Sequence, residues 1–171
     1  RSKGVMRSGQ PDGTWLSYYA DGTLRETGTW ADGQRSGTWL QHHPTGAVFE
    51  RVDHVEGAPS GRWELHFPDG QLGDKMTWER GRQIGLEEDF DPSGRKVAEG
   101  TFDAAGRPTA PWRCFPAGGE VAEIAAPPRL TTPRAACDAG EGPTLPDPDG
   151  SDEIGRNPKL EPGFEMRPRG R

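Results

Sequence analysis

A unit of 24 residues dominates the first two-thirds of the sequence. The triplets Gly13-Thr14-Trp15, Gly37-Thr38-Trp39 and Gly61-Arg62-Trp63 recur at that spacing. A ring follows three residues later in four units, at Tyr18, His42, His66 and Phe90. A fourth unit has lost its tryptophan at Glu87, and a worn fifth copy carries Trp112. A fixed period of this length indicates a repeat architecture, in which each unit is stabilised by its neighbours.

Each unit carries two turn signals. The first is a dipeptide ending in glycine, at Asp21-Gly22, Thr45-Gly46, Asp69-Gly70 and Ser93-Gly94. The second is a single glycine at Gly33, Gly57, Gly81 and Gly106, which follows the rings Trp30, His54, Trp78 and Phe102. Asp-Gly between alternating segments favours a type I′ hairpin turn, because glycine adopts positive φ without steric strain. We therefore expect two strands per unit, and nine or ten strands of roughly six residues between positions 5 and 115.

Helices are excluded from this part of the chain. Glycine or proline interrupts every long stretch before position 120, and apolar residues do not recur with helical spacing. Only 30% of the chain is apolar, which is too little for a thick two-layer core. The predicted fold is all-β: an elongated, single-layer antiparallel β-meander of two-strand repeats, followed by an extended proline-rich C-terminal arm.

The repeat resembles the MORN-repeat family, in its short bacterial variant that is often described as antitoxin-like. The resemblance rests on Gly13-Thr14-Trp15 with Tyr18-Tyr19 and Asp21-Gly22, on Gly28-Thr29-Trp30 with Asp32-Gly33, and on their later copies. It covers residues 5–116, although the fourth and fifth units depart from the pattern. The resemblance implies an elongated β-meander that serves as a scaffold, a dimerisation surface or a membrane-proximal adaptor, and it implies no catalytic activity.

The aromatic columns are the candidate binding residues. Trp15 and Tyr18 are an odd number of positions apart, so regular alternation sends them to opposite faces of the sheet. We expect the Gly-x-Trp tryptophans to pack over glycines of the next strand and to supply the thin core. The alternative is that some of them stack on a ligand. The candidate binding set is Trp15, Tyr18, Trp30, Trp39, Trp63 and Trp78.

The sequence divides into a repeat domain at 1–117 and an arm at 118–171, where the period stops and prolines accumulate. The segments 121–130 and 160–166 are candidates for docking on the repeat or on a partner. Cys114 and Cys137 are compatible with one disulfide, although two separate thiols fit slightly better. A bridge would contribute roughly 3 kcal/mol by loop closure and would favour the cell envelope or the extracellular space over the cytoplasm.

Charge and motifs exclude several classes of function. The net charge of −6 is spread along the chain without a basic cluster, so nucleic acid and anionic membrane surfaces are not expected partners. No apolar run approaches the roughly 20 residues that span a bilayer. The start at Arg1 suggests that an N-terminal segment has been lost.

No catalytic, metal or cofactor motif is expected to operate. The four histidines, at His42, His43, His54 and His66, are interpreted as substitutes in the aromatic columns. The acidic stretch 147–153 does not match a calcium loop. Glu87, Glu88, Asp89 and Asp91 are interpreted as solvated residues beside a turn, because a single-layer sheet offers no cleft to shift their pKa values.

The predicted function is therefore a non-enzymatic protein-interaction scaffold. Its aromatic stripes and open sheet edge would bind a protein partner or a second copy of the chain, and the arm would dock on itself or on the partner. The main alternative is a binder of glycan or cell-wall polymer that uses the tryptophans as stacking platforms. Partner binding of the antitoxin kind ranks third, because no residue indicates a toxin.

Overall fold

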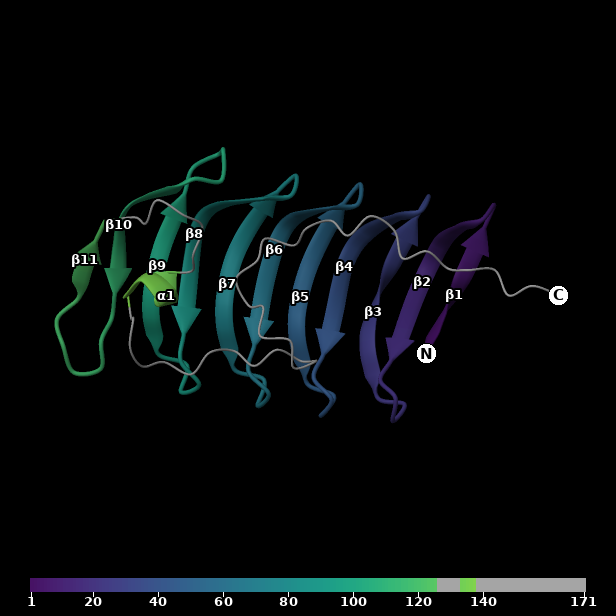
Figure 1. Cartoon of the computed structure of the whole chain (residues 1–171), viewed down its shortest axis with the longest axis horizontal. Helices are drawn as coiled ribbons and strands as arrows, with labels where there is room; N and C mark the ends of the chain where they lie inside the picture. Colours follow the sequence, from purple (N-terminus) through teal and green to yellow (C-terminus); the bar gives the residue numbers. More distant parts are fainter. Residues whose placement is uncertain (126–132, 138–171) are drawn as a thin grey trace.

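The computed structural model describes residues 1–125 and 133–137, which form one antiparallel sheet of eleven strands paired in chain order (Figure 1). The strands are β1 Ser2–Arg7, β2 Gln10–Tyr18, β3 Leu24–Ala31, β4 Gln34–His42, β5 Val48–Val55, β6 Ala58–His66, β7 Leu72–Glu79, β8 Arg82–Phe90, β9 Lys96–Phe102, β10 Pro108–Cys114 and β11 Ala122–Ile124. One short helix, α1, spans Pro133–Cys137. The single-layer meander predicted from the repeat is confirmed.

Two kinds of hairpin alternate along the sheet. The tight turns between β1 and β2, β3 and β4, β5 and β6, and β7 and β8 have positive φ at both central residues, which is type I′ geometry. Their first residues, each at φ 50°, are Ser8, Asp32, Glu56 and Arg80, and a glycine follows each one. These turns close the second strand of one unit onto the first strand of the next.

The type I′ turn expected at Asp21-Gly22 is wrong. There only Gly22 has positive φ, and the Tyr19 N–H donates to the Thr23 carbonyl at 2.8 Å. The Asp21 carboxylate accepts the Thr23 N–H at 2.9 Å, which stabilises a type I turn followed by a left-handed glycine. The repeated loops therefore have three central residues rather than two.

Gly106 also lies in a three-residue loop, where the period predicts a two-residue turn. The Asp103 N–H donates to the Arg107 carbonyl, and the Gly106 N–H donates to the Asp103 carbonyl, both at 2.9 Å. The longer loop accounts for the position of Trp112, which comes one residue late in the repeat.

The glycine of each Gly-x-Trp triplet forms a β-bulge. Between the pairs Thr27↔Leu40 and Thr29↔Ser36, β3 has one residue and β4 has three, and the extra backbone includes Gly37 at φ 66°. The same shift recurs at Gly13, Gly61 and Gly85, all with positive φ. Glycine is required there by backbone conformation, and the bulge aims the following tryptophan.

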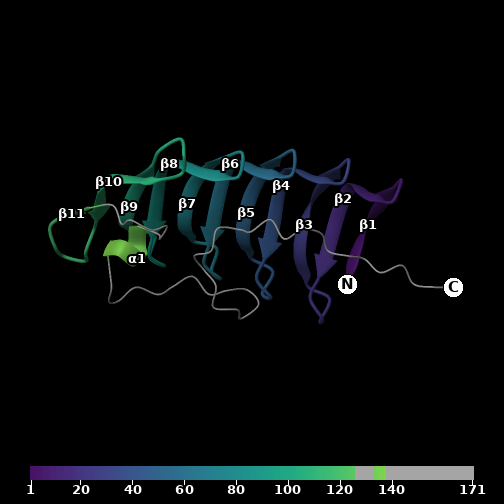
Figure 2. The ribbon, with the colours of Figure 1, turned by 45° about the horizontal axis from the view of Figure 1, so that its top comes forward.

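The core is thin and lies on one face of the sheet. Its buried apolar side chains run from β4 to β10 and include Trp39, Val52, Met76, Phe102 and Trp112. At the β8–β10 end, α1 covers this face (Figure 2). Among residues 1–125 and 133–137, no helix is both long enough and apolar enough to cross a bilayer.

Candidate interaction face

Cross-strand pairing assigns the side chains to two faces, because directly opposed residues point to the same side of a sheet. Trp15 is opposite Gly28, Trp39 is opposite Val52, and Trp63 is opposite Met76. We call the side with these tryptophans the aromatic face, and the other side the charged face.

Trp15 and Trp39 lie over glycines of the preceding strand, whereas Trp63 is opposite Val52 there. A Cβ atom at Gly28 of β3 would lie 2.1 Å from the Trp39 ring of β4, and one at Gly4 of β1 would lie 1.9 Å from the Trp15 ring. The expected packing over glycine is therefore present, but its predicted direction, toward the next strand, is wrong. The bulge in the tryptophan's own strand turns its ring back toward the strand before it.

A second aromatic row contacts the first. The Trp30 and Trp39 rings meet edge to face with their centroids 5.4 Å apart, and the centroids of Trp63 and Trp78 are 4.7 Å apart. The Arg35 guanidinium lies 4.1 Å from the Trp39 ring centroid and 2.8 Å from Oε1 of Glu26. The aromatic face thus combines rings in mutual contact with an ion pair between Arg35 and Glu26.

The structure brings five of the six candidate binding residues onto this face. Trp39 and Trp78 are buried, at 2% and 7% exposure, and Trp15, Trp30 and Trp63 are half-buried. Tyr18 is separate from them, because it ends β2 beside the loop and pairs with Leu24 across a register shift. The tryptophans are therefore chiefly core residues that leave part of their rings at the surface.

Carboxyl groups form a row beside the tryptophans. Glu26, Glu50 and Asp74 occupy the same position in successive units, 24 residues apart, on the aromatic face. Burial raises the pKa of Glu50 to about 7, and the facing Trp63 indole and the Arg35 charge only partly offset it. This row gives the aromatic face an acidic character as well as an apolar one.

The charged face has a different composition. It carries ion pairs between and along strands, including Arg51 with Asp53 at 3.1 Å and Lys75 with Glu88 at 3.2 Å. Lys96 also pairs with Glu99, at 3.0 Å. Both signs of charge are matched there, so this face is hydrated and internally neutralised.

The side chains at the loops tie each unit to the next through a backbone carbonyl. The Tyr19 hydroxyl donates to the His42 carbonyl at 2.6 Å, and Nε2 of His43 lies 3.1 Å from the His66 carbonyl. The corresponding residue of the third unit is Phe67, which has no donor. There the Arg134 guanidinium, from α1, donates to the Phe90 carbonyl instead.

His43 and His54 pack against aromatic rings of the repeat. His43 is buried and meets the Phe49 ring edge to face at 5.0 Å, while His54 lies beside Trp39. Burial and the nearby Arg35 charge lower the pKa of His54 to about 4. No group of three or more metal-binding side chains occurs among the residues that the structure describes.

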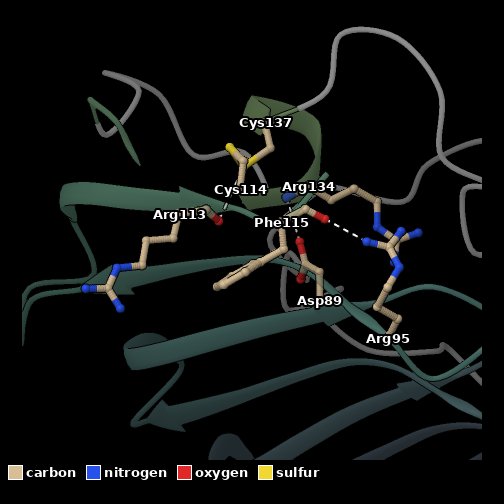
Figure 3. Close-up of a disulfide and its surroundings, with 7 residues drawn as sticks. All are labelled: Asp89, Arg95, Arg113, Cys114, Phe115, Arg134 and Cys137. Carbon is tan, nitrogen blue, oxygen red and sulfur yellow. Dashed lines mark hydrogen bonds between the residues drawn. A yellow bond between two sulfur atoms is a disulfide. The ribbon is translucent and has the colours of Figure 1, made fainter. Parts of the chain in front are cut away.

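A disulfide and a hydrogen bond from Arg134 to Asp89 hold α1 against the aromatic face (Figure 3), together with the bond from the Arg134 guanidinium to the Phe90 carbonyl. Cys114 of β10 is bonded to Cys137, and the Arg134 backbone N–H donates to Oδ2 of Asp89 at 2.6 Å. Pro133 is fully buried, and a Cβ atom at Gly100 would lie 2.9 Å from its ring. We call the surface beneath α1 the cradle, made of Asp74, Glu87, Asp89, Gly100 and Trp112.

The expectation that Glu87 and Asp89 are solvated is wrong. Asp74, Glu87 and Asp89 are 6%, 2% and 0% exposed. Burial raises the pKa of Asp74 to about 6 and that of Glu87 to about 8. It also raises the pKa of Asp89 well above its usual range, with further upward contributions from the neighbouring carboxylates. Glu88, by contrast, lies on the charged face and forms ion pairs.

One signal in the sequence marks the cradle. Glu87 stands where earlier units have Trp39 and Trp63, and Asp89 stands where they have Gln41 and Leu65. A repeat that replaces core positions with carboxyl groups indicates a local partner for those groups. That partner, α1, lies in the arm, where no period predicts a helix.

No family model matches the chain, and no similar sequence was found among curated proteins.

Proposed function

We propose that this protein is a non-enzymatic interaction scaffold of the MORN-repeat type, and that the aromatic face between β2 and β7 binds a protein partner. The proposal rests on the different composition of the two faces of the sheet. The charged face neutralises itself with ion pairs, whereas the aromatic face keeps Trp15, Trp30 and Trp63 half-buried. Among the described elements, α1 covers one end of the aromatic face, with its main contacts at β8, β9 and β10.

The chemistry of the aromatic face favours a particular kind of partner. Half-buried rings next to a row of carboxyl groups fit a surface that is apolar with basic side chains at its rim. A second copy is the first partner to test, because the edge strand β1 is also exposed, with Val5 at 58% and Met6 at 47%. The remaining arm, 138–171, lies outside the described residues.

Glycan binding is less well supported. Stacking on a sugar requires an open ring face, but Trp39 and Trp78 are buried and the Arg35 guanidinium lies over the Trp39 ring. The rings of Trp63 and Trp78 also cover one another. These contacts favour protein recognition by the edges of the rings over sugar recognition by their faces.

Two matched leucine substitutions test the proposal. Leu65 is half-buried on the aromatic face of β6, opposite Asp74, and Leu40 is half-buried on the charged face of β4, opposite Thr27. Sedimentation equilibrium should show concentration-dependent association of the wild type, loss of association in Leu65→Lys, and no change in Leu40→Lys. A monomeric wild type, or equal effects of the two substitutions, would contradict binding of a second copy through the aromatic face.

A further inference from the structure

The cradle holds a proline followed by an arginine. The buried Pro133 ring lies above Gly100 and next to Trp112, where a Cβ atom at position 100 would come 2.9 Å from the proline ring and 2.7 Å from the indole. The next residue, Arg134, presents its backbone N–H to Asp89 and its guanidinium to the Phe90 carbonyl. An apolar slot beside a buried carboxylate and a backbone carbonyl acceptor is a small recognition site with defined chemistry.

Most of the cradle belongs to the fourth and fifth units, with Asp74 from the third. In units one and two, Tyr19 and His43 reach the carbonyls that correspond to that of Phe90, so those positions are filled by the repeat itself. The Phe90 carbonyl accepts instead from Arg134, a donor that lies outside the sheet. Asp74 and Asp89 face each other across β7 and β8, so an uncovered cradle would present paired carboxyl groups to solvent.

The disulfide decides whether α1 can leave. Only five residues form α1, and its main contacts with the sheet are with β8, β9 and β10. A helix of this length has little stability of its own. The covalent bond keeps α1 at a high effective concentration beside the cradle. Cys114 is 8% exposed and Cys137 is half-buried, so Cys137 is the more accessible of the two bonded cysteines.

We propose that the Cys114–Cys137 disulfide is a redox-sensitive latch on a binding site. With the bond closed, α1 fills the cradle; with the bond open, the cradle accepts a segment of a second protein in which arginine follows proline. The cradle lies at the β7–β10 end of the sheet, and its occupation by α1 is tested without any association through Trp30, Trp63 and Leu65, so the inference does not depend on the proposed partner binding.

Opening requires a dithiol reductant. Its thiolate attacks Sγ of Cys137, the Cys137–Cys114 bond breaks, and Cys114 leaves as a thiolate that takes up a proton. The second thiol of the reductant then attacks the mixed disulfide and releases Cys137 as a thiol. The reductant supplies two electrons and two protons in total, and leaves as its own disulfide.

Limited trypsin digestion of the full chain tests the latch. The Arg134–Ala135 bond should be cut at least ten-fold faster after reduction by a dithiol, while far-UV circular dichroism keeps the sheet signal. Cys137→Ser should be cut at the fast rate with or without the dithiol. Unchanged slow cleavage after reduction would mean that α1 stays docked without the bond. Loss of the sheet signal would mean that the bond holds the whole sheet, and either result overturns the latch.

Disulfide trapping tests recognition by the cradle. The protein is Cys137→Ser/Arg134→Ala, which keeps Cys114 and weakens its own α1, and the probe is the octapeptide Thr-Thr-Pro-Arg-Ala-Ala-Cys-Asp in a glutathione buffer. Mass spectrometry should find at least ten-fold more mixed disulfide than with the same peptide carrying alanine in place of its proline and arginine. Equal trapping of the two peptides overturns the binding site. Oxidised wild type, in which Cys114 is bonded, is the blank for both.

Discussion

At the scale of single residues, the glycines of the repeat have two separate functions. Gly28 provides space, because the Trp39 ring occupies the volume that its side chain would need. Gly37 has open space around its Cα but adopts φ 66°, so it provides a backbone conformation instead. The sequence shows both glycines at fixed positions, but only the structure separates the two reasons.

Gly37→Ala should lower the free energy of unfolding by about 1 kcal/mol, because an L side chain is strained at positive φ. Gly37→Asn should lower it by less, since asparagine tolerates the left-handed region better than other residues. Urea unfolding followed by circular dichroism measures both. Equal stabilities of Gly37→Ala and the wild type would contradict the assigned bulge.

Glu50 predicts a pH dependence of stability. Its pKa is raised from 4.5 to about 7 by burial, so the folded chain binds this proton more tightly than the unfolded chain. The resulting stabilisation is fully present below pH 4.5 and is lost as the pH rises through 7. It amounts to at most about 3 kcal/mol, at 1.36 kcal/mol per pKa unit.

In Glu50→Gln this part of the pH dependence should disappear, so the variant should gain stability over the wild type as the pH rises from 5 to 8. The exposed Glu79→Gln is the matched control and should follow the wild-type curve. Urea denaturation across that pH range provides the comparison. Parallel curves for wild type and Glu50→Gln would show that Glu50 is not buried as described.

At the scale of the elements, side-chain hydrogen bonds at the loops connect neighbouring units, in addition to the backbone pairing of their strands. Tyr19→Phe removes the hydroxyl that donates to the His42 carbonyl, and should destabilise the chain by about 1 kcal/mol in urea unfolding. Tyr18→Phe is the control, since its hydroxyl makes no hydrogen bond in the described part of the chain. A larger loss in Tyr18→Phe would contradict the ladder of carbonyl contacts.

The strands could be predicted from the sequence because each has a local signal: a glycine turn at both ends and a ring at a fixed offset. The turn types could not be predicted in the same way. Asp21-Gly22 fits both a type I′ turn and a longer loop, and the choice depends on the register of β2 against β3. Register is a property of paired strands, and no single segment contains it.

The burial of the carboxyl groups in the cradle could not be predicted from the sequence, for a different reason. Glu87 and Asp89 look solvated in a run of four acidic residues, but two of the four point to the aromatic face beneath α1. The sequence does suggest that Glu87 and Asp89 point to one face and Glu88 to the other, because side chains alternate along β8. It does not suggest that α1 covers Glu87 and Asp89, because α1 lies more than forty residues after Asp89 in the chain.

At the scale of the whole molecule, the sheet behaves as a one-dimensional array. Every strand contacts its sequence neighbours, and α1 supplies the main contacts between distant parts among the described residues. Stability should therefore be close to a sum of unit and interface contributions.

Deletion of residues 34–57 removes one unit and joins the Asp32-Gly33 turn directly to β6. The shortened chain should fold, with a smaller denaturant dependence of unfolding, because less surface is exposed when it unfolds. Deletion of residues 34–58 takes one further residue, from β6, and the two-residue turn cannot make up for it. The shift of one residue in β6 moves Trp63 to the opposite face, so this control should lose cooperative unfolding. If both deletions behave alike, the units are not interchangeable modules.

The central claim is that the aromatic face, rather than the charged face, is where the molecule meets a protein. Hydroxyl-radical footprinting reads side chains individually and can compare dilute with concentrated wild-type protein. We expect Trp30, Trp63 and Leu65 to become protected on association, while Leu40 and Leu86 of the charged face keep their reactivity. Protection of Leu40 and Leu86, with Trp30, Trp63 and Leu65 unchanged, would contradict it.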